Sequence, residues 1–203
     1  MNLKPKIVPA KPHKIHYRDG DAAGKLMEQI GKELPPDCKR PIVIVCIGTD
    51  RSTGDALGPI IGTKLEHQSS SAFHVYGTLD KPVHAVNLES ELEQIYGCHK
   101  NPYIIGIDAS LGKAANIGMI TFGKGPVKPG AGVKKQLPPV GHAHVTGIVN
   151  VSGFMEYFVL QNTRLNLVMQ MADTIAGGLH AACLERMPDA DLFSDRKSEA
   201  RPV

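Results

Sequence analysis

The segment Pro-Ile-Val-Ile-Val-Cys-Ile at residues 41–47 constrains the fold more than any other feature of the sequence. It is short, uninterrupted by polar residues and rich in β-branched side chains, the pattern of a strand buried on both faces of a parallel sheet. A turn rich in Gly and Asp follows at residues 48–55, and apolar residues then recur at helical spacing. Because neighbouring parallel strands need crossover connections, this strand–loop–helix unit predicts an α/β domain.

Strands and helices are expected to alternate along most of the chain. We expect strands at 41–47, 73–79, 103–108, 118–123 and 164–169, and helices at 21–34, 55–66, 87–97, 146–160 and 173–185. Asn87 is expected to cap the helix at 87–97, and Gly97 to end it. Residues 164–169 also fit a helical period, so a helix there is left open. This order predicts a three-layer domain in which helices flank a mostly parallel sheet, with a long loop at 124–144.

The chain length indicates how many domains to expect. A chain of 203 residues fits one domain with a sizeable core. We expect residues 19–186 to form this domain. Residues 1–18 and 187–203 are polar and lack a period, so we expect them to be flexible tails.

Charge and composition exclude several classes of protein. The 23 basic and 20 acidic residues are nearly balanced, and Trp is absent, so we expect no nucleic-acid partner. No segment reaches ~18 consecutive apolar residues and no apolar leader follows the N-terminus, so we expect no membrane contact and a cytoplasmic location. The four cysteines form no CxxC pair, and we expect reduced, mostly buried thiols.

Asp55 and Asp108 are the strongest candidates for chemistry. Asp55 stands where the helix at 55–66 begins, and Asp108 is expected to end the strand at 103–108. Ligands of open α/β sheets bind beyond the carboxyl ends of the strands, so both side chains could face one cleft. Two close carboxylates favour one protonated and one ionised group, which together can activate water. The structural alternative is that Asp55 caps its helix and Asp108 accepts hydrogen bonds from its turn.

Other kinds of site have weaker support. The glycines in residues 48–58 lack the spacing of a dinucleotide fingerprint or a P-loop, and no serine lies in a GxSxG motif. His142 and His144 form an HxH pair, and His142 with Asp55 and Asp108 would suit a divalent metal. The alternative is that these histidines only form hydrogen bonds within the loop. No cofactor is assigned, and a divalent metal is left open.

Three segments carry a resemblance to a known family. They are Ile47-Gly-Thr-Asp-Arg-Ser-Thr-Gly-Asp-Ala-Leu-Gly-Pro59, Gly106-Ile-Asp-Ala-Ser-Leu-Gly112 and Phe158-Val-Leu-Gln-Asn-Thr-Arg164. They resemble the YyaC family, whose members are proposed to act in sporulation of endospore-forming bacteria, and the resemblance runs over most of residues 41–185. More distantly, the chain is similar to the germination protease, which degrades small acid-soluble spore proteins, and to the hydrogenase maturation proteases.

The resemblance implies site residues. The germination protease has its catalytic acids at the positions that match Asp55 and Asp108. The maturation proteases use an acidic pair and a histidine to meet the metal of their substrate. The resemblance also implies a phosphorylase/hydrolase-like fold, although the chain is much shorter than the germination protease and lacks its long additions.

Together these observations predict a sporulation-associated endopeptidase in which Asp55 and Asp108 share a proton and activate water. The residues expected to contact substrate are Gly54, Asp50, Ser110 and His144. The expected partner is a peptide or protein such as a spore protein, in the cytoplasm of the sporulating cell or forespore, and a homodimer is left open. The alternative is a non-catalytic peptide-binding or assembly protein of the spore that keeps the peptidase fold.

Overall fold

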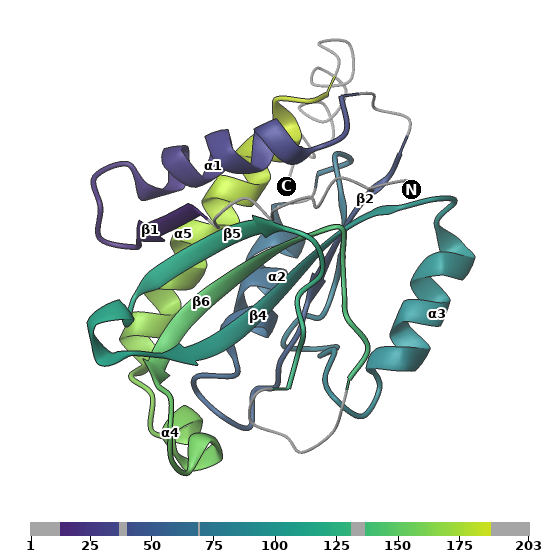
Figure 1. The fold of residues 1–203 in the computed structure, drawn as a ribbon. Helices are drawn as coiled ribbons and strands as arrows, with labels where there is room; N and C mark the ends of the chain where they lie inside the picture. Colours follow the sequence, from purple (N-terminus) through teal and green to yellow (C-terminus); the bar gives the residue numbers. More distant parts are fainter. Residues whose placement is uncertain (1–12, 37–39, 69, 131–136, 188–203) are drawn as a thin grey trace, which may run out of the picture.

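The computed structural model describes residues 13–36, 40–68, 70–130 and 137–187 (Figure 1). Within these ranges the strands are β1 (His13–His16), β2 (Ile42–Cys46), β3 (His74–Tyr76), β4 (Tyr103–Gly112), β5 (Met119–Lys124) and β6 (Ala143–Val151). The α-helices are α1 (Ala22–Glu33), α2 (Leu57–His67), α3 (Leu88–Cys98), α4 (Glu156–Gln161) and α5 (Leu165–Leu184). A 3-10 turn, η1 (Ala114–Asn116), precedes β5.

The strands form a single sheet in the order β1-β5-β6-β4-β2-β3. Strands β3, β2, β4 and β6 run parallel to one another, whereas β5 and β1 are antiparallel to their neighbours. The mostly parallel sheet predicted from the sequence is therefore confirmed. The carboxyl ends of the parallel strands meet at one edge, the usual place for a ligand in this class of fold.

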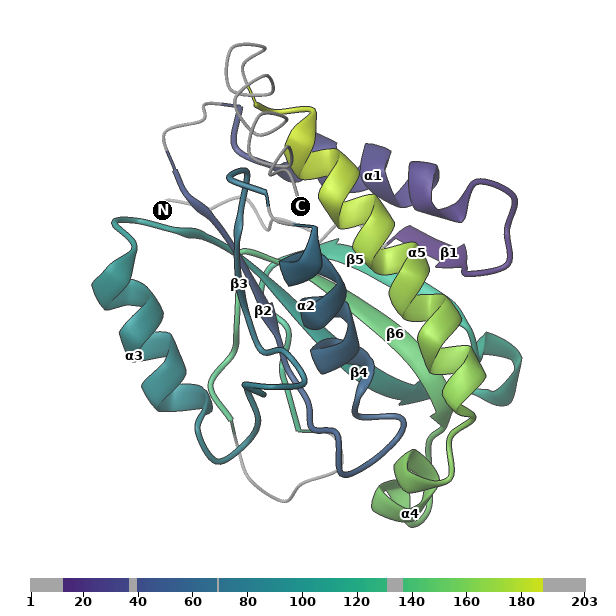
Figure 2. The ribbon, with the colours of Figure 1, turned by 180° about the vertical axis from the view of Figure 1, so that it is seen from behind.

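Helices cover both faces of the sheet. Helices α1, α2 and α5 lie together on one face, and α3 lies on the other (Figures 1 and 2). Alternate residues of β2 serve the two layers: Ile44 packs in the core under α2 and α5, and Val43 and Val45 pack in the core that contains α3. This alternation explains why the segment contains no polar residue.

The loop between β5 and β6 folds back over the sheet on the α3 face. Val127 and Val140 form an antiparallel bridge and belong to the same core as α3. They pass above Gly106 of β4, where an added Cβ would lie 2.7 Å from Val127 Cγ1. The absence of a side chain at Gly106 lets this loop approach the sheet.

The carboxyl-terminal part of the chain differs from the prediction. Residues 143–151 form β6, a strand in the interior of the sheet, rather than the start of a helix at 146–160. Ala143, Val145, Gly147 and Val149 are buried and alternate with half-exposed residues, which is the two-residue period of a strand. The strand predicted at 164–169 is also wrong, because α5 begins at Leu165 and the helical alternative holds.

The amino-terminal tail is shorter than predicted. Residues 13–16 form β1, which pairs with β5 and extends the sheet by one strand. The prediction of a tail over residues 1–18 is therefore wrong for these residues. Residues 1–12 and 188–203 lie outside the described part of the chain.

The ends of α3 also differ from the prediction. The helix continues through Gly97 to Cys98, so Gly97 does not end it. Asn87 precedes α3, but its side chain makes no bond to the first turn of the helix. Its Oδ1 accepts a hydrogen bond of 2.8 Å from the backbone N–H of His84, and its Nδ2 donates to the carbonyl oxygen of Pro82 at 3.0 Å. Asn87 therefore fixes the loop before α3.

One helix, α5, is long and apolar enough to qualify as a membrane span by length and composition alone. Half of the qualifying window is buried inside the protein, where α5 packs beside α1 and α2. A core helix passes the same test, so this feature is weak evidence for a membrane.

Candidate functional site

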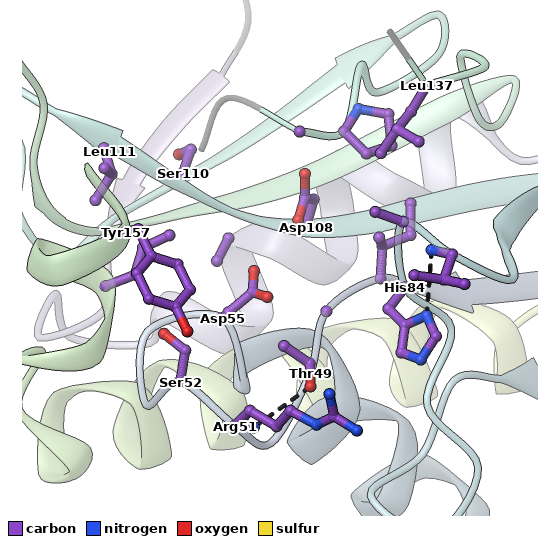
Figure 3. A pocket seen from close by; sticks show the side chains of 18 residues that line it. Thr49, Arg51, Ser52, Asp55, His84, Asp108, Ser110, Leu111, Leu137 and Tyr157 are labelled. Atoms are coloured by element: carbon purple, nitrogen blue, oxygen red, sulfur yellow. Dashed lines mark hydrogen bonds between the residues drawn. The ribbon is translucent and has the colours of Figure 1, made fainter. Parts of the chain in front are cut away.

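A cavity of about 300 Å³ lies at the carboxyl edge of the parallel strands. Its walls come from the loop after β2, the loop before α3, the second half of β4, the loop between β5 and β6, and α4. The lining residues are Ile47, Gly48, Thr49, Arg51, Ser52, Asp55, His84, Ala85, Val86, Asp108, Ala109, Ser110, Leu111, Pro129, Gly130, Leu137, Tyr157 and Leu160. Both predicted catalytic aspartates line this cavity, which is mainly apolar (Figure 3).

A tight turn after β2 positions Asp55. Gly48 has a φ of +147°, and an added Cβ would lie 2.0 Å from the carbonyl oxygen of Asp55. That carbonyl accepts a hydrogen bond of 3.3 Å from the backbone N–H of Thr49. The turn therefore closes on itself only because residue 48 has no side chain. It places Asp55 above the end of β2.

The sequence predicted that Asp108 ends its strand, but in the structure Asp108 lies within β4. The strand continues to Gly112 because β6 runs beside it and supplies hydrogen-bonding partners along its second half. Asp108 pairs in register with Thr146, and the register shifts between Ser110 and Leu111. Only 9% of the Asp108 surface is exposed.

Burial and mutual repulsion shift the pKa values of both carboxyl groups. Burial raises the pKa of Asp108 well above its usual range, and the charge of Asp55 raises it further. Burial also raises the pKa of Asp55, although a hydrogen bond from the Thr49 backbone and the charge of His84 oppose this shift. Asp108 therefore holds a proton at pH values where Asp55 is ionised, and the pair offers one acid and one base.

The two histidines of the HxH pair do not reach the cavity. His144 pairs in register with Gly106, two residues before Asp108 on β4. The His142 N–H donates to the Ile104 carbonyl, which is four residues before Asp108, or about 13 Å along the strand. His142 Nδ1 accepts a hydrogen bond of 3.1 Å from the Ile104 backbone, at the amino end of the strand. His144 Nδ1 lies 2.9 Å from the carbonyl oxygen of Gly125.

The metal site predicted from Asp55, Asp108 and His142 is therefore wrong. Within the residues that the structure describes, no three His, Cys, Asp or Glu side chains are grouped so that they could hold a metal ion. His144 is likewise not a substrate-contacting residue of this cavity, because it does not line the cavity. The parallel register carries both histidines away from the carboxyl edge.

The other predicted substrate-binding residues have mixed outcomes. Ser110 lines the cavity, and its hydroxyl donates a hydrogen bond of 3.3 Å to the Gly147 carbonyl. Gly54 does not line it, and its N–H donates a hydrogen bond of 2.9 Å to Leu160 at the end of α4. Asp50 is exposed and also lies outside the lining. Gly54 thus joins α4 to the loop that carries Asp55, and its amide is not part of the cavity lining.

Three residues that line the cavity were not predicted as site residues from the sequence. His84 lines the cavity, and its Nδ1 accepts a hydrogen bond of 3.3 Å from the Val86 backbone. In the neutral ring the proton therefore lies on Nε2. Ser52 is 6% exposed, and its hydroxyl has no hydrogen-bond partner among the described residues. Tyr157 lies on α4 and lines the cavity. The sequence prediction placed it inside a long helix at 146–160 and did not single it out.

Comparisons with known proteins give the family. Residues 14–178 match the family described as "Protein of unknown function (DUF1256)". The chain is 55% identical over 165 residues to "Uncharacterized protein YyaC" of Bacillus subtilis (strain 168), a match that covers 81% of this chain and 80% of that protein.

Among solved structures, the chain is similar to a NiFe hydrogenase maturation protease, HycI, from Thermococcus kodakarensis KOD1. The TM-score is 0.47 at 18% sequence identity, and the match covers 71% of this chain and 92% of that chain. The family match and the identity to YyaC confirm the resemblance found in the sequence, and the chain belongs to the DUF1256 family of proteins of unknown function.

Proposed function

We propose that this protein is an endopeptidase in which Asp55 and Asp108 activate water for hydrolysis of a peptide bond. The observation that carries the proposal is that both carboxyl groups line one mainly apolar cavity and have raised pKa values. Each carboxyl also accepts a hydrogen bond from its local backbone, from Thr49 and from Ala109, but these bonds alone do not account for two acids in one cavity. On the sequence resemblance to proteins of endospore formers, we further propose that it acts in the cytoplasm of a sporulating cell.

The proposed reaction divides two roles between the carboxyl groups. Ionised Asp55 accepts a proton from a water molecule, whose oxygen attacks the carbonyl carbon of the peptide. Protonated Asp108 donates its proton to the carbonyl oxygen, which gives a neutral tetrahedral intermediate. The C–N bond then breaks, the amine leaves with the proton held by Asp55, and the hydroxyl returns a proton to Asp108. Both carboxyl groups regain their starting states.

His84 supports this division of roles. The electrostatic interaction with His84 lowers the pKa of Asp55 and thus opposes the effect of burial on that carboxyl. Figure 3 shows Asp55 and Asp108 between Tyr157 on one side and His84 on the other. The bonds of Asn87 to the loop hold the backbone at His84 in place. The imidazole is therefore fixed beside the pair before any ligand arrives.

The test compares cleavage of a proteome-derived peptide library by the wild-type protein and by Asp55→Asn and Asp108→Asn. Mass spectrometry of newly formed termini measures cleavage. Each substitution is expected to lower the rate by about 10²- to 10⁴-fold, the usual contribution of a general acid or base. Circular dichroism checks that each variant remains folded.

Asp50→Asn is the matched control, because Asp50 belongs to the same loop but is exposed and outside the cavity. It is expected to cleave like the wild-type protein. Cleavage that survives in both single variants, or a wild-type protein that cleaves nothing, would overturn the proposal. Binding of peptides without cleavage would favour the non-catalytic peptide-binding alternative.

A further inference from the structure

Exposed apolar side chains are concentrated in the stretch that includes α4, from which Tyr157 and Leu160 line the cavity. Most of the large exposed apolar residues in the described part of the chain fall in one stretch that includes α4, namely Val151, Phe154, Met155, Tyr157, Phe158, Leu165 and Met169. Helix α4 itself has no buried residue. A concentration of exposed apolar side chains is typical of a binding surface.

Hydrogen bonds hold α4 and the turn after it against the loop that carries Asp55 and against β6. The Gly54 N–H donates to the Leu160 carbonyl at 2.9 Å. The Asn150 side chain donates to the Val159 carbonyl at 3.1 Å and to the Thr163 hydroxyl at 3.2 Å. Gly54 also permits close approach, because an added Cβ would lie 2.9 Å from a methyl group of Leu160. Helix α4 is therefore held in place with Tyr157 and Leu160 at the cavity.

Two of the large exposed apolar residues in the described part of the chain also line the cavity. Tyr157 on α4 is 63% exposed, and Val86, two residues after His84, is 87% exposed. Tyr157 lies on the opposite side of the acid pair from His84 (Figure 3). The Val86 N–H donates to His84 Nδ1 at 3.3 Å, so the two exposed apolar residues of the lining belong to the two walls that flank the acids. A ligand that crosses the acid pair would contact both.

The cavity also requires hydrogen bonds from its ligand. The Ser52 hydroxyl is buried and has no partner among the described residues, a state that costs free energy until a ligand supplies one. The carboxyl groups of Asp55 and Asp108 are polar groups of the same cavity. A lipid chain, or a flat apolar face of a second copy, would leave these groups unpaired. A peptide has both apolar side chains and a backbone that forms hydrogen bonds.

We propose that the cavity binds an extended peptide segment with large apolar residues on both sides of the bond that lies over the acid pair. Tyr157 and Val86 are its specificity-determining residues, and the other exposed side chains of α4 contact the next residues of the peptide. This inference rests on the proposed function, because the acid pair defines which peptide bond is meant.

The test measures binding to an Asp108→Asn protein, so that cleavage does not consume the probe. The probe is a fluorescein-labelled peptide, Ala-Gly-Leu-Phe-Gly-Ala, and the comparison peptide has Ser-Asn in place of Leu-Phe. Fluorescence anisotropy is expected to show at least about tenfold weaker binding of the Ser-Asn peptide. Adding Tyr157→Ser or Val86→Ser is expected to weaken binding of the Leu-Phe peptide by about tenfold or more, as loss of a central contact does.

Tyr96→Ser is the matched control. Tyr96 lies on α3, is 57% exposed, and does not line the cavity. Its substitution removes a similar exposed tyrosine and is expected to leave binding unchanged. Light scattering and flotation with phosphatidylcholine vesicles are measured on the same variants. If Tyr157→Ser converts a dimer to a monomer and leaves peptide binding unchanged, the surface binds a second copy. If it abolishes vesicle binding and leaves peptide binding unchanged, the surface binds lipid. Either result would overturn the inference.

The two proposals fail in different ways. Equal binding of the two peptides, or full binding by Tyr157→Ser, would overturn the apolar specificity even if the wild-type protein cleaves peptides. Selective binding that Tyr157→Ser abolishes, in a wild-type protein that cleaves nothing, would support the binding specificity and overturn the peptidase.

Discussion

Strand β4 has one polar cluster at its amino end and another around Asp108 in its carboxyl half, here called the carboxyl end, and the two clusters differ in how their groups are paired. At the amino end, Arg40 donates hydrogen bonds to the carbonyl oxygens of Asn101 and Pro102 at 3.1 and 2.9 Å. Its guanidinium also lies 5.5 Å from the ring centroid of Tyr103 and 3.2 Å from His142 Nε2. Arg40, His142 and Tyr103 therefore each have a hydrogen-bond partner: the His142 Nδ1 accepts from the Ile104 N–H at 3.1 Å, and the Tyr103 hydroxyl donates to the Glu33 carbonyl at 3.0 Å.

At the carboxyl end, the polar groups are crowded and incompletely paired. Asp55 and Asp108 carry the same charge when both are ionised, and the pKa of each is raised by burial. The Ser52 hydroxyl has no partner within the described residues. Buried polar groups in this state cost stability. The comparison teaches that hydrogen-bonded groups at the amino end stabilise the fold, whereas the crowded groups at the carboxyl end lower its stability, a cost that our proposal of a ligand site explains.

The largest loss of stability is expected from breaking the amino-end cluster. Arg40→Ala removes two hydrogen bonds and the contact with Tyr103, and it is expected to lower the free energy of unfolding by about 2 kcal/mol. The measurement is the urea midpoint at pH 7. Arg51→Ala, an exposed arginine at the carboxyl end, is the control and is expected to change the value by less than about 0.5 kcal/mol. Equal effects of the two substitutions would contradict the comparison.

The opposite sign is expected at the carboxyl end. Because the pKa of Asp108 is raised in the folded protein, the carboxyl favours folding below its usual pKa and loses that benefit as the pH rises. Asp108→Asn removes the cost and is expected to raise the free energy of unfolding at pH 7 by about 1.4 kcal/mol for each pKa unit of the shift. The gain should shrink as the pH falls toward about 4. A less stable Asp108→Asn protein at pH 7 would show that the carboxyl is structural.

A smaller difference is expected between two buried hydroxyls. Ser52 and Thr163 are each 6% exposed, but the Thr163 hydroxyl donates to the Val159 carbonyl at 3.0 Å and accepts from Asn150. Thr163→Val is therefore expected to lower the free energy of unfolding by about 1 kcal/mol, whereas Ser52→Ala should leave it unchanged or raise it slightly. Thermal unfolding of both variants measures this difference. A destabilised Ser52→Ala protein would mean that its hydroxyl has a partner.

The smallest effect concerns the pH dependence of the amino-end cluster. Burial and the charge of Arg40 lower the pKa of His142 below its usual value of 6.5. The unfolded chain therefore binds a proton more readily, and the contribution of His142 to stability is lost as the pH falls below 6.5. His142→Gln is expected to flatten the decrease in stability between about pH 7 and pH 5. An identical slope in the wild-type protein and the variant would exclude this role.

The amino-terminal half of the domain was predictable because its elements are local. The strand at 41–47 and the helices at 21–34 and 55–66 have hydrophobic periods that do not depend on distant residues. The placement of Asp55 and Asp108 at one edge also followed from the parallel sheet, since consecutive parallel strands end on the same side.

The carboxyl-terminal half was harder because its patterns are ambiguous. The segment 143–151 is apolar enough for a helix. Its alternation of buried and half-exposed residues is hard to recognise in the sequence, because one buried position is Gly147 and not a larger apolar residue. It becomes a strand because β4 and β5 pair with it on both sides. Its position then determines the outcome for the HxH pair, because a strand that starts at Ala143 carries both histidines to the amino side of Asp108.

The sequence by itself determined that the chain forms an α/β sheet with two acids near the ends of its strands, because local periodicity and turn chemistry specify such units. Only the tertiary structure decided which polar groups share the cavity. His84, Ser52 and Tyr157 come from separate segments, and no local pattern relates them. Their proximity arises from the packing of loops and α4 around the sheet, and the pKa shifts of the acids arise from the burial that this packing produces.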